Sequence, residues 1–133
     1  MDYYDALGYS LSTLYTNKNL ALGGSVALIF CDVLPVREVS NIDFVCLKEN
    51  LPSEFLLDSP ATECEECEVY PGVTVFGILV NYIALKSAPL NRFKKDGLWI
   101  QDTKDILKHK RNRGNEVDKK DLENIILPAE DLL

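Results

Sequence analysis

The stretch that decides the fold runs from Leu20 to Lys48 and reads LALGGSVALIFCDVLPVREVSNIDFVCLK. It places a Gly23-Gly24-Ser25 turn between a short apolar strand and an apolar helix. Small residues at such a turn let the backbone approach a phosphate, and the N-terminus of the following helix favours an anion. The turn therefore indicates a phosphate-binding site, although a tight turn without a ligand fits the two glycines equally well.

The second half of this stretch predicts a strand from Asn41 to Leu47. Side chains alternate along a strand, so Asn41 and Asp43 share one face while Ile42 and Phe44 share the other. Carboxylate and amide oxygens are ligands for hard cations such as Mg²⁺. A phosphate-binding turn that faces two metal-ligand positions is the outline of a nucleotidyl-transfer site.

The remaining sequence alternates between helical and extended patterns. Helices are expected over residues 2–14, 26–32, 102–114 and 118–126, and strands over 19–22, 41–47, 69–79 (bent or split at Pro71-Gly72) and 97–100. Residues 58–68 and 87–95 are expected to be loops, and Ser25 is expected to cap the helix that follows it. This order predicts a single α/β domain of the α+β kind over residues 1–133, a small mixed β-sheet flanked by helices.

Charge is distributed unevenly along the 133 residues, whose formal net charge is −7. Residues 86–120 hold eleven of the fourteen Lys and Arg residues against five acids. The overall acidity argues against DNA as a partner, whereas the basic segment leaves RNA or a polyphosphate open beside a plain solvated helix face. With no apolar run of about 18 residues and no signal-peptide pattern, we expect a cytoplasmic protein without a membrane partner.

The four cysteines divide into two kinds. Cys31 and Cys46 lie in apolar segments and are expected to be small buried side chains. Cys64-Glu65-Glu66-Cys67 is compatible with a zinc site or a redox pair. A zinc site needs further ligands that the neighbouring sequence does not offer, so an acidic surface loop is favoured.

The ordered series of small motifs resembles a known family. The GGS turn is followed by a short helix, by Arg37 and Ser40, and by a D-h-D-like pair (h is apolar) that ends in Asp43. This series is similar to that of minimal nucleotidyltransferases of the DNA polymerase beta superfamily, and most similar to the abortive-infection toxin type. Asn41 stands where that family has Asp.

The C-terminal part also resembles the toxin-type branch, which has a D-h-h-x-x-K helix, a basic loop and a K-D-x-x-D-h segment. Asp105-Ile106-Leu107-Lys108 is matched to the first of these patterns, and the segment from Asp118 to Leu122 to the last. The resemblance implies that Lys108 faces the nucleotide. It likewise implies that the nucleotide phosphates are bound by Gly23, Gly24, Ser25 and Arg37.

The activity implied by the resemblance is Mg²⁺-dependent transfer of a nucleoside monophosphate from a nucleoside triphosphate to an RNA or protein hydroxyl. Asp43 is the implied catalytic residue and metal ligand, with Asn41 as a neutral second ligand. The third carboxylate of the family is expected at Thr74, unless Glu68 or Asp58 replaces it. Asn41 and Thr74 therefore predict weakened activity, and the alternative is an inactive module that binds a nucleotide or a partner protein.

Overall fold

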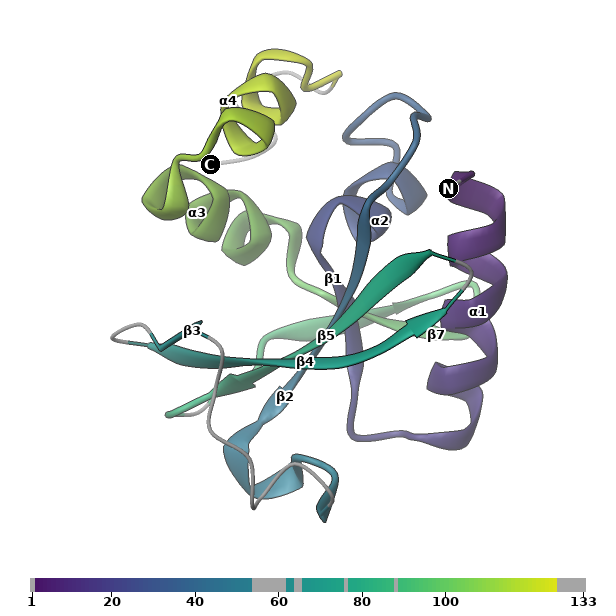
Figure 1. Ribbon diagram of the computed structural model, residues 1–133, viewed down its shortest axis with the longest axis vertical. Coiled ribbons are helices and arrows are strands. Elements are labelled where there is room, and N and C mark those ends of the chain that lie inside the picture. Colours follow the sequence, from purple (N-terminus) through teal and green to yellow (C-terminus); the bar gives the residue numbers. More distant parts are fainter. Residues whose placement is uncertain (1, 54–61, 64–65, 76, 88, 127–133) are drawn as a thin grey trace.

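In the described part of the chain, seven strands form one mixed sheet with the order β3-β4-β5-β2-β1-β7-β6 (Figure 1). The computed structural model describes residues 2–53, 62–63, 66–75, 77–87 and 89–126. The strands are β1 (Ala21–Gly23), β2 (Asn41–Leu47), β3 (Thr62–Glu63), β4 (Cys67–Val75), β5 (Ile78–Leu85), β6 (Arg92–Lys95) and β7 (Leu98–Gln101). The helices are α1 (Tyr3–Thr16), α2 (Gly24–Phe30), α3 (Thr103–Arg113) and α4 (Glu116–Glu123), with a 3-10 turn at Lys48–Asn50.

The centre of the sheet is β2, which pairs in parallel with β5 and antiparallel with β1. β1 in turn pairs in parallel with β7, and β4 runs antiparallel to β5. This mixture of directions and the flanking helices confirm the predicted α+β fold class. The register aligns Asp43 with Gly23 on one side and with Asn81 on the other.

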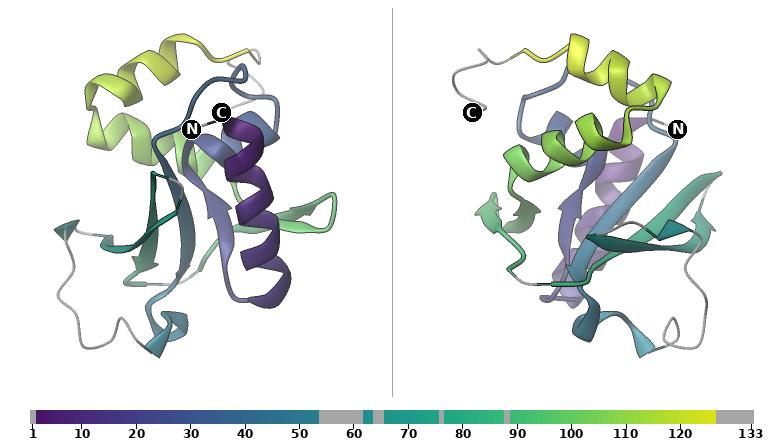
Figure 2. Two further views of the ribbon diagram at one scale, coloured as in Figure 1. Left: turned by 45° about the vertical axis from the view of Figure 1, so that its right-hand side comes forward. Right: turned by 90° about the vertical axis from the view of Figure 1, so that its left-hand side faces the viewer.

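The main hydrophobic core covers one face of the sheet. Alternate β2 side chains, Ile42 and Phe44 among them, pack there against α1, α2 and the first turns of α3. Val45 lies in a smaller cluster with Cys67 and Ile83. Figures 1 and 2 show α1 along the sheet, and α3 with α4 gathered near α2 at one end of it. That end is where β2 begins and β1 turns into α2.

Several sequence predictions need correction at element ends. The helix after the glycine turn begins at Gly24, so Ser25 lies in its first turn and Gly23, which has no side chain, is the N-cap residue. Pro71-Gly72 does not divide the extended segment but lies within β4, where the register shifts before Thr74. β4 and β5 are separated at Gly77, whose φ of +80° is in the region that favours glycine.

Two segments predicted as loops contain strands. Within residues 87–95 the structure forms β6, which pairs with β7 at the edge of the sheet. Within residues 58–68 it forms β3 and the start of β4. The surface-loop prediction is wrong at Cys67, which is buried and disulfide-bonded, while Cys64 lies outside the described residues. Cys46 is buried, as predicted, whereas Cys31 is only partly buried, and both are free.

Candidate functional site

A small polar pocket lies at the end of the sheet where β2, α2, α3 and α4 come together. Its volume is about 90 Å³, and its lining includes Ser25, Arg37, Ser40, Asn41, Asp43 and Lys110. Five of these six residues come from the Leu20–Lys48 stretch after the Gly24 turn, and Lys110 comes from α3. The structure therefore brings the polar β2 side chains and Ser25 into one pocket.

Close contacts within the chain explain why both residues of the turn are glycines. Gly24 has a φ of +62°, which L side chains rarely adopt, and a Cβ there would collide with the Asp43 carboxylate. A Cβ on Gly23 would approach Val45 Cγ2 to 2.7 Å and Gln101 Oε1 to 2.9 Å. Both glycines are thus required by close packing, and Gly24 in particular makes room for Asp43.

Asp43 is a nearly buried carboxylate with an amide as its hydrogen-bond partner. Its exposed fraction is 7%, and Asn81 Nδ2 donates to its Oδ1 at 3.2 Å. Burial raises the pKa of Asp43, while the Asn81 hydrogen bond and the positive charge of Arg113 and Lys110 act in the opposite direction. Burial prevails, so the ionised form of Asp43 is less stable than that of an aspartate in water.

The neighbouring strand offers Asn81, and not Thr74, beside Asp43. β5 is the strand next to β2 and carries Asn81 at the Asp43 register, whereas Thr74 is exposed one strand further out on β4. Glu68 cannot substitute, because its buried carboxylate is bound to Lys48 Nζ at 2.8 Å and to the Tyr70 hydroxyl. Asp58 lies outside the described residues. The position expected for the third carboxylate, Thr74, is therefore not beside Asp43, because the order of strands in the sheet decides which strand lies next to β2.

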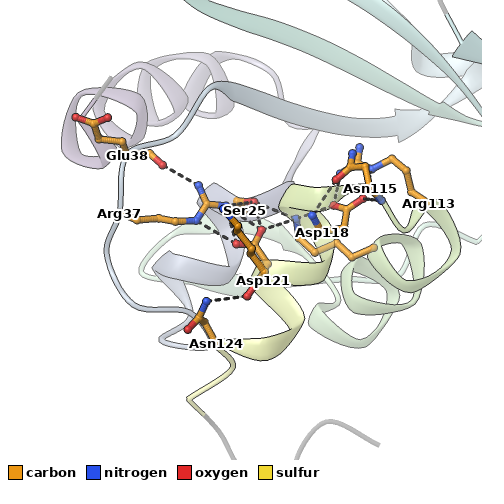
Figure 3. A network of polar contacts seen from close by, with 10 residues as sticks. Ser25, Arg37, Glu38, Arg113, Asn115, Asp118, Asp121 and Asn124 are labelled. Carbon is orange, nitrogen blue, oxygen red and sulfur yellow. Dashed lines mark hydrogen bonds and ion pairs between the residues drawn. The ribbon is translucent and has the colours of Figure 1, made fainter.

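Three hydrogen-bond donors on the other side of the pocket converge on a carboxylate of α4 (Figure 3). Arg37 Nη2 lies 2.8 Å from each carboxylate oxygen of Asp121, and Lys110 Nζ lies 3.0 Å from Oδ2. The Ser25 hydroxyl donates to Asp121 Oδ2 at 3.0 Å and accepts from Arg37 Nη2 at 2.9 Å and from Lys110 Nζ at 3.0 Å. These residues form one connected charge network.

Asp118, one turn earlier on α4, extends this network. Arg113 donates from Nε and Nη2 to its two oxygens, each at 2.7 Å, and Lys110 Nζ lies 3.5 Å from Oδ1. Asn115 caps α4 in a reciprocal capping box with Asp118, in which each side chain accepts from the other's backbone N–H. Asp118 is fully buried and Lys110 is 2% exposed.

The two α4 carboxylates are strongly stabilised as anions. Burial alone would raise their pKa values, but the hydrogen bonds and charges of the surrounding cations outweigh it. The pKa of Asp118 is lowered chiefly by Arg113, and the pKa of Asp121 by Arg37 and Lys110. No buried side-chain nitrogen or oxygen among the described residues lacks a hydrogen-bond partner.

The lysine that lines this pocket is Lys110, whereas the resemblance implied Lys108. Lys108 is exposed on α3 and is not among the residues that line the pocket. Counting D-h-h-x-x-K from Asp105 reaches residue 110, so the correct spacing was available in the pattern itself. The partners Asp118 and Asp121 lie in the matched K-D-x-x-D-h segment, but the sequence did not connect them to Ser25 or Arg37.

The residues around Asp43 suit at most a weakly held cation. Among the described residues, no group of three or more His, Cys, Asp and Glu side chains is placed to hold a metal ion. Asp43 supplies carboxylate oxygens, and Asn41 supplies an amide oxygen on the same strand face. Mg²⁺ often binds through one or two carboxylates together with waters and substrate phosphates, so this donor set fits one ion and not a pair.

Comparison with known proteins supports the fold. A crystal structure of a proposed nucleotidyltransferase from Thermotoga maritima matches with a TM-score of 0.58 and 17% sequence identity, over 92% of this chain and 93% of that chain. At this identity the likeness establishes the nucleotidyltransferase fold alone. No protein-family model and no curated protein matches the chain. No helix among the described residues is long and apolar enough to cross a membrane.

Proposed function

We propose that this chain binds a nucleoside triphosphate at the pocket between β2 and α4 and transfers its nucleoside monophosphate slowly, with Mg²⁺, to a hydroxyl. The observation that carries the proposal is the composition of one pocket. Arg37, Lys110 and Ser25 provide cationic and hydroxyl donors on one side, and Asp43 with Asn41 provides metal-ligand oxygens on the other. The nucleotidyltransferase fold of the whole chain supports the same assignment.

Magnesium would be held by Asp43 and Asn41, and when bound it would offset the negative charge that develops on the phosphates. Asn41 adds an oxygen but no charge, and Asn81 occupies the neighbouring strand position with an amide. A single anionic ligand offsets less of the +2 charge than two or three would. Slow transfer is therefore the expected consequence of this donor set.

Pyrophosphate release from each nucleoside triphosphate in the presence of Mg²⁺ tests the catalytic part. Asp43→Asn keeps the shape of the side chain and its bond from Asn81, so the fold should be retained while pyrophosphate release falls about 100-fold, the order expected for one preorganised electrostatic group. Glu49→Gln, at an exposed carboxylate away from the pocket, should leave the rate unchanged. Equal rates for wild type and Asp43→Asn would overturn the role of Asp43.

Calorimetric titration with a nucleoside triphosphate tests the binding part. Ser40 is exposed at the pocket, so Ser40→Trp should fill the pocket while every residue of the charge network is retained. Ser87→Trp, at an exposed turn, is the matched control. Loss of binding in Ser40→Trp alone supports the pocket, whereas equal binding by both variants would place the nucleotide elsewhere.

A second candidate function is binding without catalysis. Its specific support is the pair of amides, Asn41 and Asn81, at the strand positions that flank Asp43. The nucleotide or a partner protein would then be the ligand, and Mg²⁺ would have no effect on it. Nucleotide binding that Ser40→Trp abolishes, together with no pyrophosphate release under any condition, would decide for this candidate.

The acceptor hydroxyl in the proposed reaction belongs to RNA or to a protein, as the resemblance to toxin-type nucleotidyltransferases suggests. Incubation with a radiolabelled nucleoside triphosphate and a bacterial lysate would separate the two, because the label would enter ribonuclease-sensitive or protease-sensitive material. If the chain acts as a toxin, its expression should arrest bacterial growth, and Asp43→Asn should relieve the arrest. Growth arrest by Asp43→Asn to the same degree would argue against transfer as its cause.

A further inference from the structure

Helix α1 carries a second apolar face that is largely exposed in the described part of the chain. Its inner face, which includes Ala6 and Leu14, belongs to the main core. On its outer face Tyr4, Leu11 and Tyr15 are 64%, 43% and 77% exposed. Asp5 is the only charged residue of the helix, whereas charged residues make up 26% of the whole chain. An uncharged, aromatic outer face of this kind is typical of an interaction surface.

The spacing of the outer face is that of a helix-packing seam. Tyr4, Gly8, Leu11 and Tyr15 follow one another at intervals of four, three and four residues. Residues at these intervals form a single stripe along a helix, which is the arrangement by which two helices pack side by side. We call these four residues the α1 stripe.

Gly8 indicates a partner helix, because no packing contact in the described part of the chain requires a glycine at this position. Glycine is unfavourable in the interior of a helix, yet among the described residues a Cβ at Gly8 would meet no atom within 4 Å beyond its chain neighbours and its own helix backbone. Neither close packing nor a positive φ within the chain therefore requires it. A glycine on an exposed seam allows another helix to approach closely.

A groove beside the α1 stripe can receive side chains of the partner. It is lined by Leu11, Ser12, Tyr15 and Thr16 of α1 and by residues 96–98 at the turn between β6 and β7, with a volume of about 530 Å³. The groove adjoins the C-terminal half of the stripe, next to Tyr15. None of its lining residues lines the β2–α4 pocket.

We propose that a second copy of this chain packs on the α1 stripe, with the two α1 helices antiparallel about a two-fold axis. The stripe is self-complementary in an antiparallel pair, because both of its ends are tyrosines and its small residue, Gly8, lies opposite its large one, Leu11. In the antiparallel pair Tyr4 lies beside the partner's Tyr15, and Gly8 receives the partner's Leu11. A two-fold interface requires this kind of self-complementarity.

Charge supports the antiparallel direction. Asp2 and Asp5 lie at the N-terminal end of α1, and Lys18 follows its C-terminal end, where its Nζ lies 4.9 Å from the centre of the Tyr15 ring. Antiparallel packing places each acidic end beside the partner's Lys18 and opposes the two helix dipoles favourably. Parallel packing would place like charges together at both ends.

The size of the contact predicts a dimer that dissociates on dilution. A helix of 14 residues is about 21 Å long, so a contact made by one helix pair and its adjoining groove is a small one, and small interfaces belong to weak or transient complexes. Sedimentation velocity over a range of concentrations should therefore show a monomer–dimer equilibrium. A monomer at every concentration up to the solubility limit would overturn the proposal.

Two substitutions separate this interface from the fold. Gly8→Leu should stabilise the monomer against heat, because Gly8 has free space around it and leucine favours helices, yet it should abolish the dimer by occupying the space for the partner's Leu11. Leu11→Lys should also give monomers, with an unchanged circular dichroism spectrum. Ile126→Lys, at another exposed apolar residue, is the control and should remain dimeric. A dimer that survives both α1 substitutions would refute the interface.

Cysteine pairing tests the direction of the helices. A mixture of Tyr4→Cys and Tyr15→Cys proteins should form a disulfide-linked heterodimer on mild oxidation, and neither variant alone should form more linked dimer than wild type. Linkage of each variant with itself would instead indicate parallel helices and overturn the antiparallel arrangement. The proposal is independent of the proposed function, because nucleotide binding and pyrophosphate release do not enter either test.

Discussion

The two sides of the β2–α4 pocket differ in how their charges are balanced. On the α4 side, the buried carboxylates of Asp118 and Asp121 accept hydrogen bonds from three cationic side chains. On the β2 side, Asp43 is also buried, but among the described residues its one side-chain hydrogen bond comes from the Asn81 amide. The same residue type therefore has a lowered pKa on one side and a raised pKa on the other.

This difference distinguishes carboxylates that hold helices in place from a carboxylate that is available to a ligand. A buried ion pair that is fully hydrogen-bonded fixes the position of the elements it joins, here α4 against α2 and α3. A buried carboxylate without a cation stores unfavourable energy that a bound cation would relieve. The α4 side is therefore expected to matter most for stability and the β2 side for ligand binding.

The largest effect is expected from breaking the α4 side. Asp121→Ala leaves Lys110 and Arg37 without their main anion and should lower the free energy of unfolding by about 3–5 kcal/mol. Glu123→Ala, at an exposed position of the same helix, should change it by less than about 0.5 kcal/mol. Urea denaturation followed by circular dichroism measures both values.

The same variant tests whether Asp121 fills an anion site. If the donors can bind a phosphate, inorganic phosphate should raise the melting temperature of Asp121→Ala more than that of wild type, because ligand binding to the folded state stabilises it. An equal response of both proteins would show that the donors serve α4 alone. A loss of stability near zero in Asp121→Ala would mean that the network is not what holds α4.

Local sequence signals were enough for β2 but not for this network. The limits of Asn41–Leu47 were predicted to the residue, because alternation and β-branched content are properties of neighbouring residues. The bond from Ser25 to Asp121 joins residues 96 positions apart, so no local pattern contains it. Burial of Lys110 could not be predicted either, because lysine is almost never buried without a partner and its partners, Asp118 and Asp121, are identified only by the fold.

Edge elements were missed for a related reason. β6 has an exposed, mostly basic sequence, Arg92–Lys95, and its strand conformation depends on pairing with β7. The resemblance implied Thr74 as the position of the third carboxylate, but the sequence does not show which strand lies next to β2, and that strand is β5. The fold class could be predicted because it needs only the order of elements, whereas the site depends on strand order and on long-range contacts.

A smaller effect is expected at the contact between Gly24 and Asp43. Gly24→Ala should cost about 2–3 kcal/mol, since it adds a left-handed backbone penalty of about 1–2 kcal/mol and a clash with the Asp43 carboxylate. Gly114→Ala is the matched control, because its φ of +63° is nearly the same but its Cβ would have only ordinary contacts. Urea denaturation gives the loss of unfolding free energy for each variant, and the difference between the two losses is the cost of the clash. Equal losses would mean that Asp43 moves aside without cost.

Asp43 and Asp118 should give pH effects of opposite sign. Because burial raises the folded-state pKa of Asp43, its contribution to stability is present below the unfolded pKa of about 3.9 and is lost as pH rises through the folded pKa. Asp43→Asn should therefore be more stable than wild type at pH 7 by about 1 kcal/mol, and this advantage should disappear at acid pH.

Asp118 has a lowered folded-state pKa, so its contribution is present above the unfolded pKa and is lost as pH falls through the folded pKa. Asp118→Asn should consequently be less stable than wild type at pH 7 and approach it in acid. Thermal melting between about pH 3 and pH 7 measures how the stability of each variant, relative to wild type, changes with pH. The same pH trend in the two variants would contradict the contrast between the two sides of the pocket.

The smallest effect is expected from adding charge to the β2 side. Asn41→Asp places a second carboxylate on the strand face of Asp43, so it should lower stability without metal by of order 1 kcal/mol through like-charge repulsion. Mg²⁺ should reverse this loss, because the ion then has two anionic ligands, and pyrophosphate release should increase. The measurement is thermal melting of wild type and variant with and without Mg²⁺, with Asn50→Asp, outside the pocket, as the charge-matched control. A Mg²⁺ response no larger in Asn41→Asp than in Asn50→Asp would mean that this face does not hold a cation, and Asp43 would then be a packing residue whose role is to fix the Gly24 turn.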